Sequence, residues 1–360
     1  MPALAVADAL RASGAHVEFA GGDRAEARLV PEAGYRLHRL HVAIVPRKAS
    51  VAAVRAAATD AKSVFAAARL LARVAPDAVL GGGGYVSAPV GLAAELRRAP
   101  LVLMEADGHL GITNRLLAPM AARVCTALPL AGHTGAKFVV TGRPVPATNV
   151  DRDAARRRFE IAEEETLIVV FGGSQGARTI NDAALAALAD PLLPGAPAAP
   201  AAGARTPQAA APSKPGDLRL RVLHAAGERD LPQLTAPGAH YDLRGYVDSF
   251  MEALIAADLV IARSGGSVWE IAAAGRPSIL IPYPHATQDH QTANARHFEH
   301  AGAAIVISDR ELTAALLRRT VSDLLRDPQR LRAMSAAAIA AARPRAAAAI
   351  AAEVLAVAGG

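Results

Sequence analysis

Residues 261–294, IARSGGSVWEIAAAGRPSILIPYPHATQDHQTAN, carry the clearest α/β pattern of this 360-residue chain. An apolar run at 259–262 leads into a small-residue turn, a helical segment ends at Gly275, and a second apolar run covers 278–281. Strand, turn, helix and strand in this order present a ligand at the carboxyl ends of parallel strands. An ordinary capped helix in an α/β unit has the same pattern, so this stretch alone leaves both readings open.

The turn in this stretch is suited to a phosphate group, because it leaves backbone N–H groups free where a helix begins. Its residues are Ser264, Gly265, Gly266 and Ser267. Glu270 lies about one turn into the helix, where its carboxylate can accept two hydrogen bonds from a vicinal diol. A polar loop is expected after the second strand, and it carries His285, Gln288, Asp289, His290 and Gln291.

Composition limits the classes of protein to which the chain can belong. The length suffices for two α/β domains, and 52% hydrophobic against 4% aromatic residues predicts an aliphatic core. A net charge of +6 favours anionic partners, but nucleic acid is not expected because no RRM, zinc or helix-turn-helix signature occurs. The single Cys125 fits a buried residue in a reducing compartment. No apolar run reaches the roughly 18 residues of a membrane span.

Strand and helix patterns alternate along the whole chain, which predicts parallel sheets covered by helices on both faces. The segment TGRPVP at 141–146 predicts a linker between a domain at 1–143 and a second at 144–342. The Ala/Pro/Gly-rich stretch 191–216 is expected to be a disordered insertion. Residues 343–360 are expected to form a helix that packs back on the first domain. Two similar halves suggest a ligand in the cleft between them.

Further motifs follow other predicted strands. GGSQG at 172–176 joins a strand to a helix and fits either a phosphate loop or a tight packing turn, but it lacks the dinucleotide and P-loop fingerprints. The glycines at 81–84 likewise fit a ligand loop or a structural turn. Glu105 and Asp107 follow another strand as candidate acid or base groups. No metal site is expected, since His285 and His290 lie on a proline-containing loop without ligand spacing.

In this order the motifs resemble the MurG family of glycosyltransferases, glycosyltransferase family 28. The segments that carry the resemblance are PALAVA (2–7), GGYVS (83–87), GITNR (111–115), GGSQGAR (172–178), GYV (245–247), ARSGG (262–266), EIAAAG (270–275), and HQ (290–291) with NA (294–295). The resemblance implies a GT-B fold of two Rossmann-like domains. It also implies inverting transfer of N-acetylglucosamine from UDP-N-acetylglucosamine to the C4 hydroxyl of the undecaprenyl-diphosphate-linked muramyl-pentapeptide, a step of peptidoglycan synthesis, with no cofactor or metal.

The resemblance also implies roles for individual residues of the site. Glu270 would bind the ribose hydroxyls, and Gln291 would read the sugar hydroxyls. Arg143 would face the cleft near the diphosphate. The remaining substrate-binding residues would be Ser174, Gln175 and Gly176 with the turn Ser264–Gly265–Gly266–Ser267 at the diphosphate, and Tyr246 and Val247 near the uracil.

The chain departs from the family pattern at two places. The family's E-Q-N motif appears as Glu105-Ala106-Asp107, so Asp107 stands where an amide usually contacts the substrate. Asp107 fits either a proton acceptor, and so a candidate catalytic base, or a residue that only holds a hydrogen bond. The family also begins with a strand and a G-G-T-G-G-H loop, whose histidine is usually proposed as base or acceptor contact, before the helix that opens this chain. We therefore expect Met1 to be an internal methionine of a longer protein. If the protein does start there, we expect weak UDP-sugar binding and poor turnover.

A polyprenyl-linked acceptor implies a peripheral protein on the anionic cytoplasmic face of the cell membrane. Leu116, Leu117, Pro119 and Met120, between Arg115 and Arg123, fit a membrane-binding patch or a helix packed in the core. Two rival functions stay open. Another GT-B transferase or a UDP-N-acetylglucosamine epimerase is disfavoured by the segments at 83–87 and 112–115, whereas a non-catalytic nucleotide-sugar-binding protein is compatible with the missing loop.

Overall fold

The computed structural model describes residues 2–42, 51–130, 132–133, 135–146, 149–173, 176–193, 218–286 and 289–359, with only the backbone for 51–60. The chain divides into two compact units. Unit 1 comprises residues 1–147 and 343–360, and unit 2 comprises residues 148–342. The candidate residues Ser174 and Gln175, and the low-complexity segment from residue 194 to residue 217, lie outside the described residues.

The described strands of unit 1 form two parallel sheets. One sheet contains, side by side, β3 (Val79–Gly81), β4 (Leu101–Glu105), β5 (Arg123–Thr126) and β6 (Phe138–Val140). In the other, β1 (Glu18–Gly21) pairs with β2 (Arg36–Arg39). The central strand β4 is buried along its whole length, which is why it reads as a continuous apolar run rather than an alternating one.

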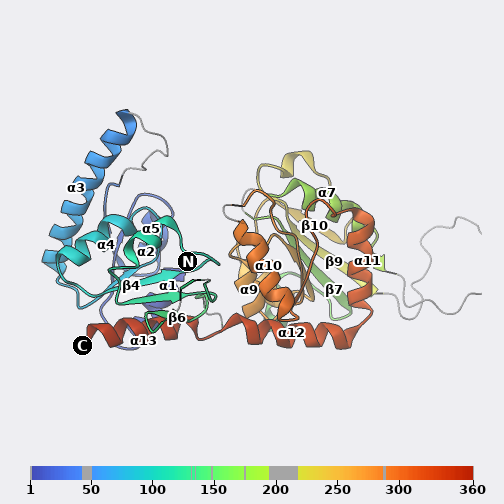
Figure 1. The fold of residues 1–360 in the computed structure, drawn as a ribbon. Helices are drawn as coiled ribbons and strands as arrows, with labels where there is room; N and C mark the ends of the chain where they lie inside the picture. Colours follow the sequence, from blue (N-terminus) through green and yellow to red (C-terminus); the bar gives the residue numbers. More distant parts are fainter. Residues whose placement is uncertain are drawn as a thin grey trace, which may run out of the picture. The chain divides into compact units, whose positions relative to one another are not determined.

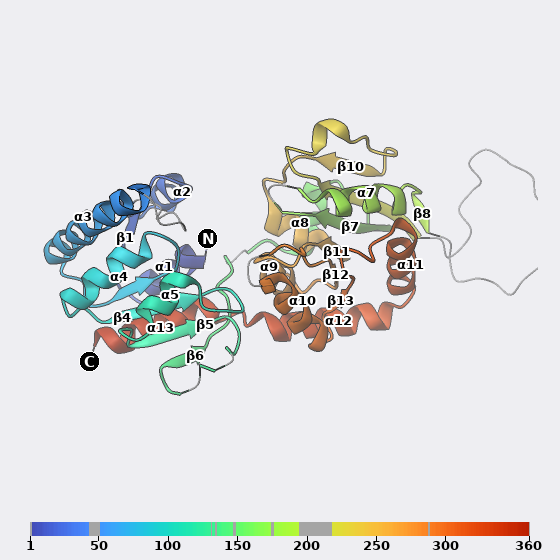
Figure 2. The ribbon, with the colours of Figure 1, turned by 45° about the horizontal axis from the view of Figure 1, so that its top comes forward.

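Helices cover both faces of the larger sheet of unit 1 (Figures 1 and 2). The described helices of the unit are α1 (Pro2–Ala12), α2 (Glu26–Glu32), α3 (Val51–Val74), α4 (Ser87–Leu96), α5 (Ile112–Leu117) and α13 (Ala346–Ala358), of which α2 packs on the two-stranded sheet. Val102 and Met104 of β4 face a core shared with α1 and α13, whereas Leu101 and Leu103 face the core under α3, α4 and α5. The last helix of the chain is therefore part of the core of unit 1, beside α1.

Unit 2 is built on a sheet with the strand order β10-β9-β7-β11-β12-β13, and all of these neighbours pair in parallel. The strands are β7 (Glu165–Phe171), β9 (Leu218–Ala225), β10 (Tyr241–Arg244), β11 (Leu259–Ala262), β12 (Ser278–Leu280) and β13 (Ala304–Val306). Numbered along the chain, this is the doubly wound order 3-2-1-4-5-6. The order reverses between β7 and β11, and a ligand is expected outside the carboxyl ends of those two strands.

Helices flank the sheet of unit 2 (Figure 2). They are α6 (Arg152–Arg158), α7 (Arg178–Ala187), α8 (Phe250–Ala256), α9 (Val268–Ala273), α10 (His290–His300), α11 (Ala314–Leu325) and α12 (Pro328–Ala342), with a 3-10 turn at Leu231–Gln233. In α7, for example, Ile180, Ala183, Ala184 and Ala187 are all buried at the spacing of one helix face. Thr313 caps α11 by accepting a hydrogen bond from the Leu316 N–H.

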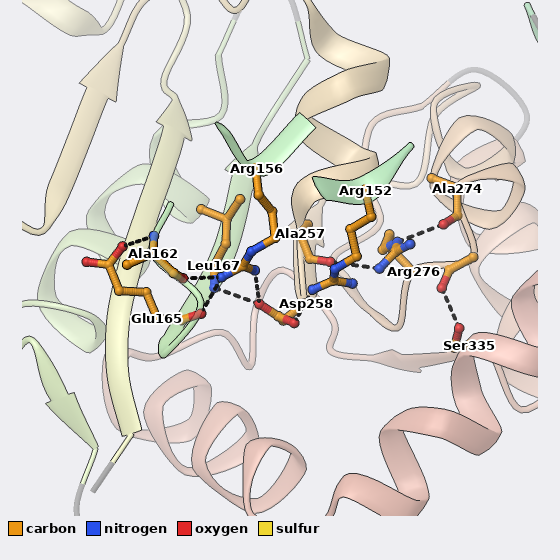
Figure 3. Close-up of polar contacts among 11 residues, drawn as sticks. Arg152, Arg156, Ala162, Glu165, Leu167, Ala257, Asp258, Ala274, Arg276 and Ser335 are labelled. Carbon is orange, nitrogen blue, oxygen red and sulfur yellow. Dashed lines mark hydrogen bonds and ion pairs between the residues drawn. The ribbon is translucent and has the colours of Figure 1, made fainter. Parts of the chain in front are cut away.

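The amino ends of β7 and β11 are held by a polar network around Asp258 (Figure 3). The Asp258 carboxylate accepts hydrogen bonds from Arg152 at 2.5 Å, from Arg156 at 3.2 Å and from the Leu167 N–H at 2.8 Å. Beside it, Arg276 donates to the carbonyl oxygens of Ala257 and Ala274. Burial lowers the pKa of Arg276 to about 10, and the nearby Arg152 adds to this effect.

Two local predictions are wrong. His290 and Gln291 do not lie in a polar loop, because α10 begins at His290, directly after Asp289 in a left-handed conformation. Leu192 and Leu193 form the short strand β8, which pairs antiparallel with β9, so they belong to the sheet and not to the low-complexity segment. β8 pairs with the first two residues of β9, before the point at which β10 begins to pair with that strand at Val222.

Candidate functional site

Glycine turns follow β7 and β11, the two strands at the point where the strand order of unit 2 reverses. After β7, a Cβ on Gly172 would lie 2.3 Å from the Ala177 Cβ, and Gly173 has a φ of +95°. Gly176 has a φ of +75°, and its added Cβ would lie 2.4 Å from the Ala226 carbonyl oxygen. The fold itself therefore requires glycine at each of these three positions, either because a side chain would clash or because φ is positive. The described part of this loop supports the packing role directly.

The turn after β11 is different, because the fold does not require its glycine. Of the described residues, only Gln291 comes within 4 Å of a Cβ built on Gly265, with its Nε2 at 3.8 Å. That is an ordinary contact. Gly265 and its neighbours Gly266 and Ser267 are also only partly buried, although Ser264 before them is fully buried. This turn has room for a group outside the protein to approach the backbone.

The first turn of α10 is tied to the Ser264 turn by two hydrogen bonds. Ser264 Oγ donates to the Gln291 carbonyl oxygen at 2.8 Å, and Asn294 Nδ2 donates to the Ser264 carbonyl oxygen at 3.2 Å. The Ser264 hydroxyl is therefore used inside the protein, so a ligand at this turn would meet backbone N–H groups.

The side-chain amide of Gln291 has a fixed orientation. Its Oε1 accepts a hydrogen bond from the Tyr283 N–H at 3.0 Å, so its Nε2 is the atom nearest to Gly265. An amide nitrogen only donates. Gln291 is therefore set to donate to a hydroxyl or phosphate oxygen placed beside the Ser264 turn.

Glu270 occupies the first turn of α9, between two buried neighbours. Trp269 is buried and stacks on His297 with ring centroids 5.8 Å apart, and Ile271 is also buried. These two side chains fix the rotation of the short helix, and Glu270 remains partly exposed at its start. Glu270 thus lies in the first turn of the helix that follows the turn at 264–267.

The loop after β10 contains the other two candidates of unit 2. The Tyr246 side chain is 60% exposed, whereas Val247 is 4% exposed and packs in the core. Gly245 before them cannot carry a side chain without moving Glu228, whose Oε1 would lie 2.5 Å from the added Cβ. A ligand at this loop would therefore meet the backbone and the exposed Tyr246 ring.

Arg263 is a buried residue of the site that the sequence did not single out as functional. Its guanidinium pairs with Asp309 at 2.5 Å, donates to Thr179 Oγ1 at 2.8 Å, and donates to the carbonyl oxygens of Ile281 and Pro282 at 3.3 Å. It thereby joins the ends of β11 and β12, the start of α7 and the loop after β13. A lone charge directly after the apolar run 259–262 is the signal that could have identified it.

The two candidates of unit 1, Asp107 and Arg143, form an ion pair. Arg143 donates to the Asp107 carboxylate at 3.3 Å and to the Ala106 carbonyl oxygen at 3.0 Å. Asp107 is 42% exposed on its side chain. Glu105 is buried and accepts hydrogen bonds from the N–H groups of Asp107 and Gly111 and from Asn114. Glu105 therefore holds the turn after β4, and Asp107 is the carboxylate open to solvent.

The glycine loop after β3 is held as a turn by side chains from its surroundings. Gly83 and Gly84 have φ values of +80° and +78°. Ser87 Oγ donates to the Gly83 carbonyl oxygen, and Thr113 Oγ1 donates to that of Gly84. The glycines are required by the backbone conformation, which supports the structural reading of this loop.

Two further observations concern metal binding and membrane-spanning helices. Within the described residues, no group of three or more His, Cys, Asp or Glu side chains is arranged to hold a metal ion. Among the helices that the structure describes, none combines the length and apolar character needed to cross a bilayer.

Residues 167–350 match the glycosyltransferase family 28 C-terminal domain, and residues 1–126 match the family's N-terminal domain. The chain belongs to glycosyltransferase family 28. This confirms the predicted family and shows that the chain is a glycosyltransferase. The N-terminal match covers unit 1 up to the end of β5, and the C-terminal match covers unit 2 from Leu167 in β7 onward and the start of α13.

Similar proteins extend over nearly the full chain. A protein of Moorella thermoacetica is 38% identical over 95% of this chain and 91% of its own length, and one of Salinibacter ruber is 38% identical over 99% and 93%. Both are named UDP-N-acetylglucosamine–N-acetylmuramyl-(pentapeptide) pyrophosphoryl-undecaprenol N-acetylglucosamine transferase.

Solved structures share the architecture. The crystal structure of Acinetobacter baumannii MurG is 27% identical, with a TM-score of 0.72 over 98% of this chain and 95% of that chain. The calicheamicin glycosyltransferase CalG4, at 17% identity and a TM-score of 0.65 over 99% of this chain and 94% of that chain, supports the fold alone. The predicted GT-B class of two Rossmann-like, parallel-sheet domains is confirmed.

Proposed function

We propose that this chain transfers N-acetylglucosamine from UDP-N-acetylglucosamine to undecaprenyl-diphosphate-linked N-acetylmuramyl-pentapeptide, a step of cell-wall peptidoglycan synthesis. The observation that carries the proposal is 38% identity to transferases named for this reaction, over 95% and 99% of the chain. The carboxyl end of the unit 2 sheet supports it, because it offers a carboxylate in the first turn of a helix, an open small-residue turn and an oriented amide donor.

In this proposal, unit 2 binds the donor. Glu270 accepts hydrogen bonds from the ribose hydroxyls, and backbone N–H groups of residues 264–267 bind the diphosphate. The loop at Ser174, Gln175 and Gly176 contributes to the same diphosphate. Gln291 donates to a sugar hydroxyl with the nitrogen that its bond to Tyr283 leaves available. The uracil lies against the backbone at Tyr246 and Val247.

The proposed reaction is a single displacement with inversion. The acceptor C4 hydroxyl loses its proton to a general base as its oxygen bonds to the anomeric carbon, and the bond from that carbon to the phosphate oxygen breaks. The electron pair leaves with UDP, whose charge is stabilised by the backbone N–H groups and the helix dipole without a metal ion. Asp107 is the candidate base, and the Arg143 contacts fix its position.

The proposal places the protein on the cytoplasmic face of the cell membrane through apolar side chains of unit 1. Leu92 and Leu96 of α4, Ile112 and Leu116 of α5, and Phe65 of α3 are exposed, and the three helices pack side by side. Lys62 and Arg69 flank Phe65 on α3 at helical spacing and are exposed. The patch differs from the sequence prediction, because Leu116 is 67% exposed whereas Leu117 is 1% exposed and packs in the core.

A transfer assay tests the proposed function. The full chain is incubated with radiolabelled UDP-N-acetylglucosamine and the lipid-linked muramyl-pentapeptide, and labelled lipid product is expected. Calorimetry with UDP-N-acetylglucosamine runs beside it. Binding without transfer to this acceptor would overturn the proposal in favour of a non-catalytic binding protein, and transfer to a different acceptor would assign another GT-B reaction.

Membrane binding has its own test with vesicles that contain anionic phospholipid. The double variant Leu96→Glu and Leu116→Glu is expected to lose most of its co-sedimentation with vesicles while keeping its UDP affinity. Leu355→Glu, an exposed leucine of α13 outside the patch, is the matched control and should sediment as the unmodified chain does. Equal sedimentation of all three proteins would remove the patch from the proposal.

A further inference from the structure

A buried chain of hydrogen bonds crosses unit 2 beneath the loop that follows β7. Tyr241 of β10, His224 of β9 and Asn181 of α7 are its members, and all three are buried. The Tyr241 hydroxyl lies 2.8 Å from His224 Nδ1, and His224 Nε2 lies 3.0 Å from Asn181 Oδ1. Asn181 Nδ2 donates onward to the Ala226 carbonyl oxygen at 3.0 Å and to Asp230 Oδ2 at 3.2 Å.

The partners fix the position of every proton in this chain. The Ala226 carbonyl only accepts, so the Asn181 atom facing it is the NH2 group and the atom facing His224 is the carbonyl oxygen. His224 must then carry its proton on Nε2 and donate to Asn181. Its Nδ1 is left to accept from the Tyr241 hydroxyl. Burial lowers the pKa of His224 to about 4, so the neutral ring that this arrangement needs is the form present at neutral pH.

At the Asn181 end of these hydrogen bonds lies a turn that packs against the Gly176 backbone. Ala226 and Asp230 open and close the turn after β9, and the Asp230 N–H donates to the Gly227 carbonyl oxygen within it. A Cβ built on Gly176 would lie 2.4 Å from the Ala226 oxygen and 2.7 Å from Asp230 Oδ2. The two acceptors of Asn181 are therefore the same two atoms against which Gly176 is packed. A shift of this turn moves the end of the loop that follows β7.

We infer that Asn181, oriented by His224, is a positioning residue for donor binding: it sets the turn 226–230 against which the Gly176 backbone packs, and thereby the position of Gly176. The inference rests on the proposed function, because it takes Gly176 to contact the UDP diphosphate. Asn181 acts through the loop and does not touch the ligand. Tyr241 orients the ring from the far end and is not in contact with the turn.

The variant Asn181→Asp tests the inference with almost no change of shape. Its carboxylate keeps an acceptor for His224 but turns a second oxygen toward the Ala226 carbonyl and the Asp230 carboxylate. Acceptor would face acceptor, and the turn would be pushed away. The dissociation constant for UDP, measured by calorimetry, is expected to rise about tenfold or more, as expected for the loss of hydrogen bonds to charged and carbonyl groups.

Three further variants separate positioning from stability. Tyr241→Phe removes only the far hydrogen bond, so its melting temperature should fall while its UDP affinity changes less than about twofold. Asn181→Asp combined with Asp230→Asn lets the new amide donate to the new carboxylate, and it should recover part of the lost affinity. Asn181→Ala removes the contacts without adding charge and should weaken UDP binding in the same direction.

The outcomes distinguish the inference from the function on which it rests. If the unmodified chain binds UDP and both Asn181 variants bind it equally well, the inference is overturned and the proposed function stands. Equal loss of affinity in Tyr241→Phe and the Asn181 variants, in proportion to lost stability, also overturns it. Failure of the unmodified chain to bind UDP overturns the proposed function and the inference with it.

Discussion

The two ends of the parallel sheet in unit 2 differ in one respect: the carboxyl end holds a side-chain donor beside an open turn, in addition to internally bonded groups such as Arg263. At the amino end, the Asp258 carboxylate accepts hydrogen bonds from two arginines and a backbone N–H (Figure 3). Arg276 beside it donates to two carbonyl oxygens. At the carboxyl end, Gln291 holds its amide nitrogen beside Gly265, a glycine that the fold does not require.

The difference shows where a ligand can add contacts that the protein does not already make. A polar group that is satisfied internally stabilises the fold and has little left for a ligand. The amino end therefore acts as the structural base of the unit, and the carboxyl end is the candidate donor site. Three substitutions test this division and the pH dependence of stability tests the buried His224, in order from the largest expected effect to the smallest.

Glu270→Ala removes the carboxylate proposed to bind the ribose hydroxyls. The kcat/KM for UDP-N-acetylglucosamine in the transfer assay is expected to fall about 100-fold or more, which corresponds to about 3 kcal/mol for two charge-assisted hydrogen bonds. Glu299→Ala on α10, whose carboxylate pairs with Arg296, is the control and should retain near-full activity. Near-normal kcat/KM in Glu270→Ala would remove the carboxyl end from the donor site.

Asp258→Ala tests the opposite end. It leaves Arg152, Arg156 and the Leu167 N–H without their shared acceptor, and the free energy of unfolding of unit 2 is expected to fall by about 2–3 kcal/mol, reduced from the fully buried case because the pair is partly exposed. Denaturant unfolding followed by circular dichroism measures this. Below the melting transition, the dissociation constant for UDP should stay within about twofold of that of the unmodified chain. A large loss of affinity would contradict the structural role of the amino end.

The pH dependence of stability reports on His224. Its pKa in the folded protein is about 4, below the ordinary value of 6.5, so between these values the unfolded chain binds more protons. The stabilising contribution is complete above pH 6.5 and is lost as the pH falls toward 4. For this group alone, the loss between pH 7 and pH 5 is about 2 kcal/mol. In urea titrations at several pH values, His224→Gln should show a correspondingly shallower dependence, and an unchanged slope would contradict the neutral, buried ring.

Gly265→Ala has the smallest expected effect and separates ligand approach from packing. The added methyl group fits the fold, so unfolding should change by less than about 0.5 kcal/mol, whereas KM for UDP-N-acetylglucosamine should rise about tenfold as the methyl group blocks the backbone. Gly172→Ala is the contrasting control, since its Cβ would collide with Ala177 and destabilise the unit. Unchanged KM in Gly265→Ala would show that nothing approaches this turn.

Much of the fold follows from local sequence. The apolar runs before residues 172, 263 and 282 are strands, and their spacing by helical segments predicts the parallel sheet. Helix α10 was not predicted, because HQTANARHFEH is mostly polar and buries only Asn294, Ala295 and Phe298. Its position is decided by tertiary hydrogen bonds to Ser264, which local propensity does not contain.

The candidate site was predictable in its residue types but not in its orientations. Glu270 and the turn at 264–267 stand out because they follow a strand and open a helix. The orientation of the Gln291 amide depends on Tyr283, and the chain from Asn181 to Tyr241 joins residues 43 and 17 positions apart. Such pairs form only when strands, helices and loops come together in the folded unit, so no local motif predicts them.

Hydrogen exchange with and without UDP tests the central division of unit 2 most directly, because it reads both ends of one sheet in one experiment. UDP is predicted to slow exchange in peptides covering residues 262–271 and 172–178, and to leave peptides covering 162–167 and 256–259 unchanged. Protection confined to the amino end, or absent from both ends at saturating UDP, would contradict the assignment of the carboxyl end as the donor site.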